Sequence, residues 1–136
     1  MKALISTLAL LCTPVIANHL ELQINNVSNE QGKVYIELFK GEQNYNAGKS
    51  HLQNIISAKT GTIKANFSDI ESGEYVIRFF HDVNSNAKLD TNFFGIPTEG
   101  VGFSNNATMQ FGPPKYQDMA ITIKNGNNLE ITNISY

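Results

Sequence analysis

The sequence is poor in cysteine, lacks tryptophan and contains no cluster of basic residues. Among its 136 residues Cys12 is the single cysteine, so no disulfide can form within the chain. Ten lysine and arginine residues are scattered singly against twelve aspartate and glutamate residues, for a formal net charge of -2. This balance gives no electrostatic reason to expect nucleic acid or anionic lipid as a partner. We therefore expect one domain, stabilised by its hydrophobic core alone.

The main apolar run lies at the N-terminus, where residues 3–12 follow the positive charge of Lys2. Pro14 comes next, and the small side chains that end at Ala17 fit the preference of a signal peptidase. The run is too short to cross about 30 Å of hydrocarbon, which argues against a retained membrane anchor. The sequence therefore predicts a signal peptide over residues 1–17, cleaved after Ala17, and a periplasmic or secreted protein.

Cys12 raises the alternative of a lipid-anchored protein. Lipidation requires a small residue directly before the cysteine, and Leu11 is large. Cleavage after Ala17 would instead remove Cys12. The mature domain, residues 18–136, would then contain no cysteine and no transmembrane span.

Apolar and polar residues alternate with period two through much of the mature chain, which is typical of strands with one buried face. Turns rich in glycine and asparagine separate these segments, and no convincing long helix is present. Residues 125–126 (Asn-Gly) form the strongest hairpin signal and would join the last two strands. Residues 51–58 fit either a short strand or one helical turn. The other expected strands cover residues 20–24, 34–39, 63–67, 74–81, 119–123 and 129–136.

About seven short strands with tight turns predict an all-β protein. We expect a single antiparallel β-sandwich, prealbumin-like or Ig-like, with one long ordered loop. Residues 74–81 carry large side chains on both faces, which indicates a central strand buried on both sides. The long loop follows this strand, and a loop of this length in a small domain is usually functional or internally ordered.

The start of this loop resembles a calcium-binding loop. Such loops place oxygen ligands at alternate positions of a curled segment, and calcium takes six to eight of them. The residues that match positions one, three, five, seven and nine are Asp82, Asn84, Asn86, Lys88 (through its backbone carbonyl) and Asp90.

The calcium pattern has two faults. Ala87 occupies position six, where an EF-hand requires glycine, and Phe93 occupies position twelve, where it requires a bidentate glutamate. Glu99 could supply that carboxylate from the next turn, and Leu89 would insert the loop into the core. The pattern therefore predicts a weak site, with a dissociation constant of roughly 0.1–1 mM.

Two other interpretations of the loop stay open. Aspartate and asparagine at alternate positions also accept hydrogen bonds from nearby backbone N–H groups, which orders a loop without metal. Alternatively, His81, Asp82 and Glu99 could act as acid and base groups of a small hydrolase-type enzyme. No serine or cysteine nucleophile stands at a known spacing from His81, so we favour a non-enzymatic module.

Phenylalanines and glycines occupy the rest of the loop. We predict that Phe93, Phe94 and Phe103 anchor the loop on the edge of the sandwich rather than forming a ligand platform. The glycines at positions 95, 100 and 102 are predicted to adopt positive φ angles in successive turns.

These segments resemble the signature of a known family. The most specific parts are HDVNSNAKLD at residues 81–90 and FGIPTEGVGFSNN at 94–106, and GPPKYQDMA at 112–120 is also similar. Across essentially the whole mature chain, the sequence resembles a family of small exported bacterial proteins known as domain of unknown function 2141. Ala87 stands where members often carry glycine.

The resemblance implies a transthyretin-type or carboxypeptidase-regulatory-like β-sandwich without an assigned activity. Transthyretin-like hydrolases end in a Tyr-Arg-Gly-Ser tail, whereas this chain ends in Asn-Ile-Ser-Tyr, so their activity does not transfer. We expect an exported module with calcium as its candidate cofactor. Its partner would be an extracytoplasmic protein, a glycan or a small ligand.

Overall fold

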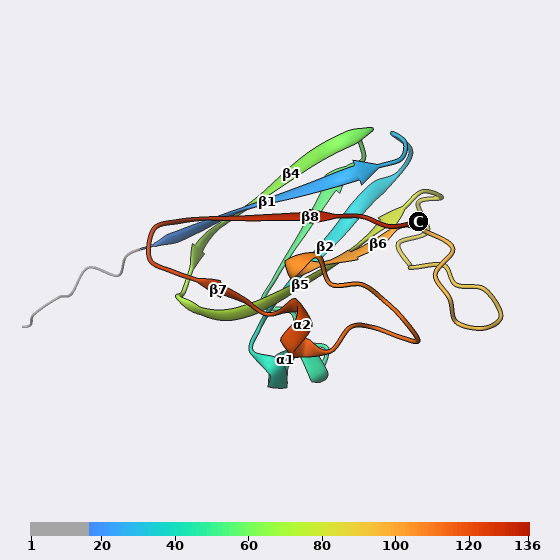
Figure 1. Cartoon of the computed structure of the whole chain (residues 1–136). Coiled ribbons are helices and arrows are strands. Elements are labelled where there is room, and N and C mark those ends of the chain that lie inside the picture. Colours follow the sequence, from blue (N-terminus) through green and yellow to red (C-terminus); the bar gives the residue numbers. More distant parts are fainter. Residues whose placement is uncertain (1–16) are drawn as a thin grey trace, which may run out of the picture.

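The computed structural model describes residues 17–136, so the predicted signal peptide, apart from Ala17, lies outside the described residues. Eight strands form two packed sheets in this part of the chain (Figure 1). The predicted all-β sandwich is therefore confirmed. None of the helices between residues 17 and 136 is both long enough and apolar enough to span a bilayer.

The first sheet has three strands in the order β4-β1-β8. β1 (Asn18–Val27) pairs antiparallel with β4 (Gly61–Ile70) and parallel with β8 (Asn127–Asn133). From Asn18 to Ile24 in β1 and from Ile63 to Phe67 in β4, every second side chain is buried, as the period-two pattern predicts. The parallel β1–β8 pair departs from the purely antiparallel arrangement that we expected.

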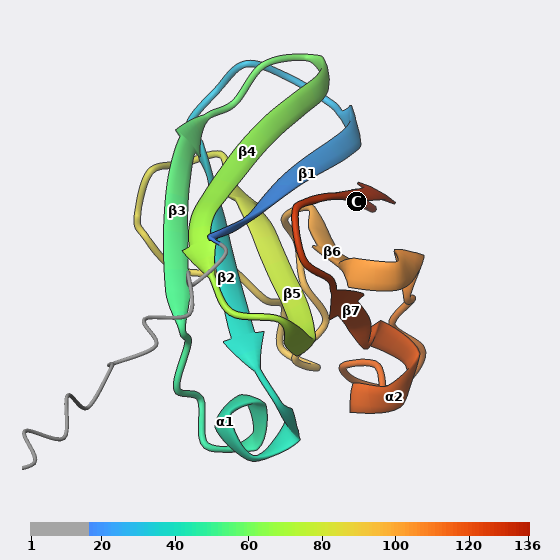
Figure 2. The same ribbon diagram turned by 90° about the vertical axis from the view of Figure 1, so that its left-hand side faces the viewer.

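The second sheet has five strands. β3 (Leu52–Ser57), β2 (Lys33–Lys40) and β5 (Gly73–Asp82) lie in this order, and β5 also pairs with β6 (Val101–Phe103) and β7 (Ile121–Ile123). β6 and β7 pair with different stretches of β5, so one follows the other along its edge. In Figure 2, β4 and β1 cross in front of β2 and β5.

Three local predictions need correction or completion. The ambiguous segment at residues 51–58 contains a strand, β3, and the strand β6 was not predicted. Met119 lies in the short helix α2 (Tyr116–Met119) rather than in a strand. The hairpin at residues 125–126 is wrong, because β7 pairs with β5 and β8 pairs with β1. Residues 125–126 do form a bend, but it carries the chain from one sheet to the other.

Both faces of β5 are covered where the strand crosses the middle of the sheet. Tyr75 and Ile77 belong to the core between the sheets, whereas Val76 lies in a second apolar cluster on the outer face. The helices α1 (Glu42–Asn46) and α2 lie near the start of β5 and contribute side chains to this second cluster (Figure 2). Tyr75, Val76 and Ile77 are all fully buried, which confirms the prediction of a central strand.

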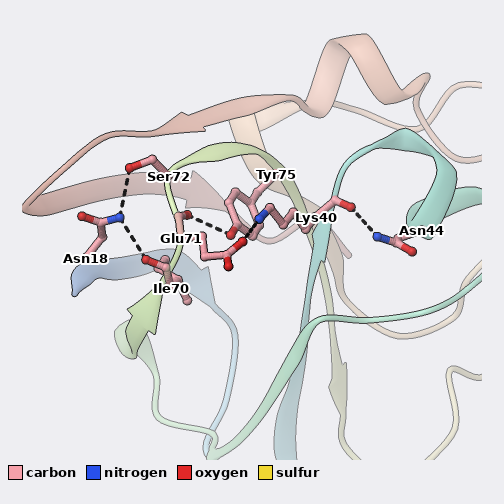
Figure 3. A network of polar contacts seen from close by, with 7 residues as sticks. All are labelled: Asn18, Lys40, Asn44, Ile70, Glu71, Ser72 and Tyr75. Carbon is pink, nitrogen blue, oxygen red and sulfur yellow. Dashed lines mark hydrogen bonds and ion pairs between the residues drawn. The ribbon is translucent and has the colours of Figure 1, made fainter. Parts of the chain in front are cut away.

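Asn18, the first residue of β1, is buried and connects three segments at the end of the sandwich. Its side-chain amide donates to the Ile70 carbonyl at 2.9 Å and to Ser72 Oγ at 3.1 Å (Figure 3). Its side-chain oxygen accepts the Gly126 N–H at 3.0 Å. The β4–β5 turn and the turn before β8 are therefore both held by the start of β1.

A second part of this network continues toward α1. The Tyr75 hydroxyl donates to the Glu71 carbonyl at 2.9 Å, and the Lys40 ammonium pairs with the Glu71 carboxylate (Figure 3). This pair holds the pKa of Glu71 below its ordinary value. Asn44 of α1 in turn donates to the Lys40 carbonyl at 2.8 Å.

Gly32, in the turn between β1 and β2, lies directly against the end of β5. Its φ angle is 69°, and a Cβ atom at this position would overlap the carbonyl oxygen of Asp82. Glycine is therefore required here for conformation and for space. Of the three loop glycines, Gly95 has the predicted positive φ, whereas Gly100 and Gly102 instead make room for Tyr136 and Phe79.

We expect Gly32→Ala to destabilise the protein far more than Gly48→Ala. Both glycines have positive φ angles, but a Cβ at Gly48 would meet nothing within 4 Å. Gly48→Ala should lower the free energy of unfolding by about 1 kcal/mol through backbone strain. Gly32→Ala should cost about 3 kcal/mol or more, because backbone atoms must also move. Urea unfolding measures both values, and equal losses would contradict the close packing at Gly32.

Candidate functional site

The long loop between β5 and β6 curls back on Asp82, the last residue of β5. Asp82 is fully buried, and its carboxylate accepts the backbone N–H of Asn86 at 3.1 Å and of Ala87 at 2.9 Å. Hydrogen bonds to backbone N–H groups offset the cost of burying a carboxylate. The first turn of the loop is therefore closed by the side chain that precedes it.

Glu99 closes the loop from its other end. It is 8% exposed, and its two carboxylate oxygens accept the N–H groups of Val83 at 3.0 Å and of Asp90 at 3.1 Å. One side chain thus joins the start, the middle and the end of the loop. Glu99 contacts Asp90 through the backbone N–H of that residue.

The remaining side chains of the predicted calcium site also converge. The Asn84 amide nitrogen donates to the Asp90 carboxylate at 2.5 Å, and the Asn86 amide nitrogen donates to the same carboxylate at 2.9 Å. The side-chain oxygens of Asn84 and Asn86 accept the N–H groups of Asn86 and Lys88, at 3.2 and 2.9 Å. The segment curls so that these side chains meet around Asp90.

This arrangement is the one expected of backbone-capping Asx turns. For Asn84 and Asn86 to bind a cation, both amides would have to rotate so that their oxygens face Asp90. Within residues 17–136, no group of three or more His, Cys, Asp or Glu side chains is placed to hold a metal ion. A cation here would therefore depend on amide and carbonyl oxygens, which are normal calcium ligands. Calcium binding stays a prediction.

His81 is buried, and both of its ring nitrogens contact other parts of the fold. One ring nitrogen, Nδ1, lies 2.6 Å from the Tyr136 hydroxyl, and Nε2 lies 2.6 Å from the Gln31 carbonyl oxygen. Both nitrogens are therefore occupied by groups of the fold. Asp82 and Glu99, the other members of the proposed acid–base set, are likewise engaged with the loop backbone. The contacts of His81, Asp82 and Glu99 do not point these three side chains at one common position.

A groove that the sequence analysis missed lies on the outer face of the five-stranded sheet. It has a volume of about 360 Å³. β2, β5 and β6 form its floor, the loop after β5 forms one wall, and α1 with the segment before α2 forms the other. Its lining residues include Tyr35, Glu37, Tyr45, Arg78, Phe80, Leu89, Thr91, Gly95, Pro97, Val101, Phe103, Met109, Gly112 and Pro113.

Aromatic rings and one ion pair make up the floor of the groove. Tyr35 and Phe80 are cross-strand partners, and their rings stack with centroids 5.1 Å apart at 9°. Next to them, Arg78 Nε donates to the Glu37 carboxylate at 2.5 Å. The Arg78 guanidinium also lies over the ring of Phe39, 4.8 Å from its centroid.

The sequence contains a signal for this floor, although large side chains on both faces of a strand by themselves indicate only burial. Residues 35, 37, 78 and 80 alternate with core positions, so they point away from the core. Large side chains at these positions predicted a second covering layer. In the structure, other residues cover Val76 and Phe39 completely, so these two side chains are fully buried. Tyr35 and Phe80 are only partly covered.

Two predictions about apolar loop residues are wrong. Leu89 is 37% exposed and lines the groove instead of entering the core. Phe93 and Phe94 are 97% and 83% exposed, so they do not anchor the loop. Because Asp82 and Glu99 order the loop by hydrogen bonds, the loop does not require apolar anchors at its tip. Phe103 is buried in the outer cluster, as predicted.

The sequence of this chain matches a known protein family. Residues 22–132, which are most of the chain, match the family described as "Uncharacterized protein conserved in bacteria (DUF2141)". The chain belongs to this family. No curated protein and no solved structure matches the chain. The family assignment is therefore confirmed, and the expected relationship to transthyretin-type sandwiches stays a prediction.

Ala87 adopts a conformation that favours glycine. Its φ angle is 61°, in the left-handed region, which costs a residue with a Cβ atom about 1–2 kcal/mol. We expect Ala87→Gly to raise the free energy of unfolding by about 0.5–1 kcal/mol, because relief of strain exceeds the added entropy of the unfolded chain.

Ala47 provides the matched control for this substitution. It is exposed and has a φ angle of -80°, so Ala47→Gly relieves no strain. That variant should be less stable than the parent by a few tenths to about 1 kcal/mol. Thermal and urea unfolding compare the two. A loss of stability in both variants would contradict the left-handed conformation of Ala87.

Proposed function

We propose that this protein is an exported, non-enzymatic binding module that holds a small, uncharged, ring-containing ligand in the groove on its outer sheet. The observation that carries the proposal is a groove of about 360 Å³ with a stacked aromatic floor and largely apolar walls. Ligand sites are commonly concave, mostly apolar and of about 300–1,000 Å³, with a few polar groups that orient the ligand.

The chemistry of the floor selects the ligand class. The Tyr35–Phe80 stack lines the groove and favours a planar ring or the apolar face of a sugar ring. Arg78 and Glu37 neutralise one another, so the groove offers no net charge to an anion or to a cation. The Arg78–Glu37 pair provides polar atoms at the edge of the rings, which can orient a hydroxyl or carbonyl group of the ligand.

The loop serves this site as a preordered wall. Leu89, Thr91, Gly95 and Pro97 line the groove, and all four lie between Asp82 and Glu99. Because these two carboxylates hold the loop backbone, little conformational entropy is lost when a ligand binds. The polar loop and the apolar groove therefore act as one unit.

Export is supported by where the domain begins. The expected cleavage site follows Ala17, which is exposed, and Asn18 is the first residue of β1 and is buried. Cleavage at this point would leave every strand of the sandwich intact. The position of the mature protein, in the periplasm or outside the cell, belongs to the same proposal.

Binding of a neutral fluorescent probe tests the groove. N-phenyl-1-naphthylamine fluoresces in apolar sites, and the protein has no tryptophan to interfere. We expect its fluorescence to rise with saturation on addition of the exported protein. Leu89→Asp, which places a charge in the groove wall, should weaken binding about tenfold or more.

Leu129→Asp is the control for the probe experiment. Leu129 is exposed on β8, in the other sheet, and should tolerate the same change without loss of binding. Absence of saturable fluorescence with the parent protein would refute the groove as a ligand site. An equal loss in the two variants would place the probe elsewhere.

Calcium is a second, separate element of the proposed function. It is favoured by the convergence of the Asn84 and Asn86 side chains on Asp90, with Glu99 adjacent. At 10 mM calcium, a dissociation constant of roughly 0.1–1 mM would stabilise the protein by about 1.4–2.7 kcal/mol. Calorimetry and thermal unfolding with calcium measure both quantities.

Charge-removing variants separate a calcium site from general ionic effects. Asp90→Asn should abolish the calcium-dependent stabilisation, whereas Asp118→Asn, at an exposed aspartate of α2, should retain it. If the parent shows neither heat nor stabilisation at 10 mM calcium, the loop is ordered by its own hydrogen bonds alone.

A further inference from the structure

We propose that the protein docks on a lipid membrane surface through two neighbouring loop tips, residues 91–98 and residues 105–114. The two tips belong to the segments before and after β6. In Figure 1 these segments extend beyond the sheets on the side where β8 ends. The proposal does not depend on the groove having a ligand.

The tips expose large apolar side chains far more than an ordinary surface does. Phe93 is 97% exposed, Phe94 is 83% exposed, and Phe111 is fully exposed. Ile96, at 58%, adds to this set. Each large apolar side chain left in water forgoes about 1.5–3 kcal/mol of transfer free energy. Clustered exposure of this kind marks an interaction surface.

The exposed side chains of the two tips face a common hollow. Phe94 and Ile96 from the first tip and Phe111 from the second line one depression on the surface. The first tip is a defined turn, in which the Asn92 side-chain oxygen accepts the N–H groups of Phe94 and Ile96, at 2.9 and 3.0 Å. The apolar side chains are therefore presented together by an ordered backbone.

The distribution of charge favours a lipid surface. Neither tip contains a charged residue, and an exposed lysine flanks each one, Lys88 before the first tip and Lys115 after the second. Among the described residues, neither lysine forms an ion pair. Next to the first tip, Glu99 is buried and Asp90 is held by two amides. Next to the second tip, Asp118 is exposed three residues after Lys115. Uncharged aromatic tips flanked by lysine match the interface of a bilayer with anionic headgroups.

The shape of the tips also favours lipid over a protein partner. A phenylalanine that is fully exposed projects from the surface, and a protein partner would need a pocket that matches each projecting ring. A bilayer admits projecting rings without such complementarity, and phenylalanine inserts at the boundary between headgroups and acyl chains. We therefore take self-association or a protein partner as the outcomes that would overturn the proposal.

Single tryptophans test the docking, because the chain has none of its own. Phe93→Trp and Phe111→Trp place a reporter at each tip, and Leu129→Trp places a control on an exposed strand of the other sheet. With vesicles of phosphatidylcholine and phosphatidylglycerol, emission of the tip reporters should shift to shorter wavelength. Brominated lipids should quench them, and the Leu129→Trp emission should not change.

The affinity for the same vesicles tests the contribution of each tip. Replacing Phe93 or Phe111 by serine should weaken partitioning roughly tenfold for each residue, and these exposed sites should leave the melting temperature unchanged. Lys88→Gln or added salt should weaken binding to vesicles that contain phosphatidylglycerol.

Two results would overturn the proposal. The first is unshifted emission of both tip reporters at saturating lipid, with a normal melting temperature. The second is a shift that appears without lipid as the protein is concentrated, together with dimers in analytical ultracentrifugation. That result would assign the tips to contact between copies of the chain. These measurements do not depend on the groove, so a failure of probe binding there would not change their outcome.

Discussion

The loop between β5 and β6 must satisfy its backbone N–H groups largely without a sheet partner, in a domain with no disulfide to hold it. Two buried carboxylates, on Asp82 and Glu99, meet this constraint by accepting four backbone N–H groups from residues 83–90. The groove wall and the first phenylalanine tip are both parts of this loop. Their positions therefore depend on two buried acidic side chains.

This dependence gives a physical role to acidic residues that resemble catalytic or metal-binding groups. Asp82 and His81 are adjacent in sequence, but they lie on opposite faces of β5, as consecutive residues of a strand must. His81 contacts Tyr136 and Gln31 at one side, and Asp82 supports the loop at the other. The pattern of polar residues at 81–90 is therefore explained first by folding, and any cation would be added to a loop that is already ordered.

The sandwich could be predicted from the sequence because burial of one strand face imposes a period of two. Leu20, Leu22 and Ile24 show it without interruption, and all three are buried. The partner of each strand could not be predicted in the same way. The turn at residues 125–126 specifies a change of direction, but pairing is decided by the side chains of β1 and β5, which are distant in sequence.

The candidate site was predicted in part. The Asn84 and Asn86 side chains meet at Asp90, as their alternate spacing in a curled segment suggests, whereas Asp82 contacts the loop backbone instead. The groove could not be found in this way, because its lining comes from segments between residues 35 and 113. Nor does a single sequence state whether Phe93 faces the protein or the solvent. That choice depends on how the whole loop is held.

The parallel pairing of β1 with β8 has a mechanical consequence. The two strands run in the same direction, so the start of β1 and the end of β8 lie at opposite ends of the pair. A force that pulls these two ends apart acts along the strands and loads the hydrogen bonds between them in shear, all at the same time. When it is pulled at these two ends, the sandwich would resist stretching through this pair of strands, rather than opening one bond after another.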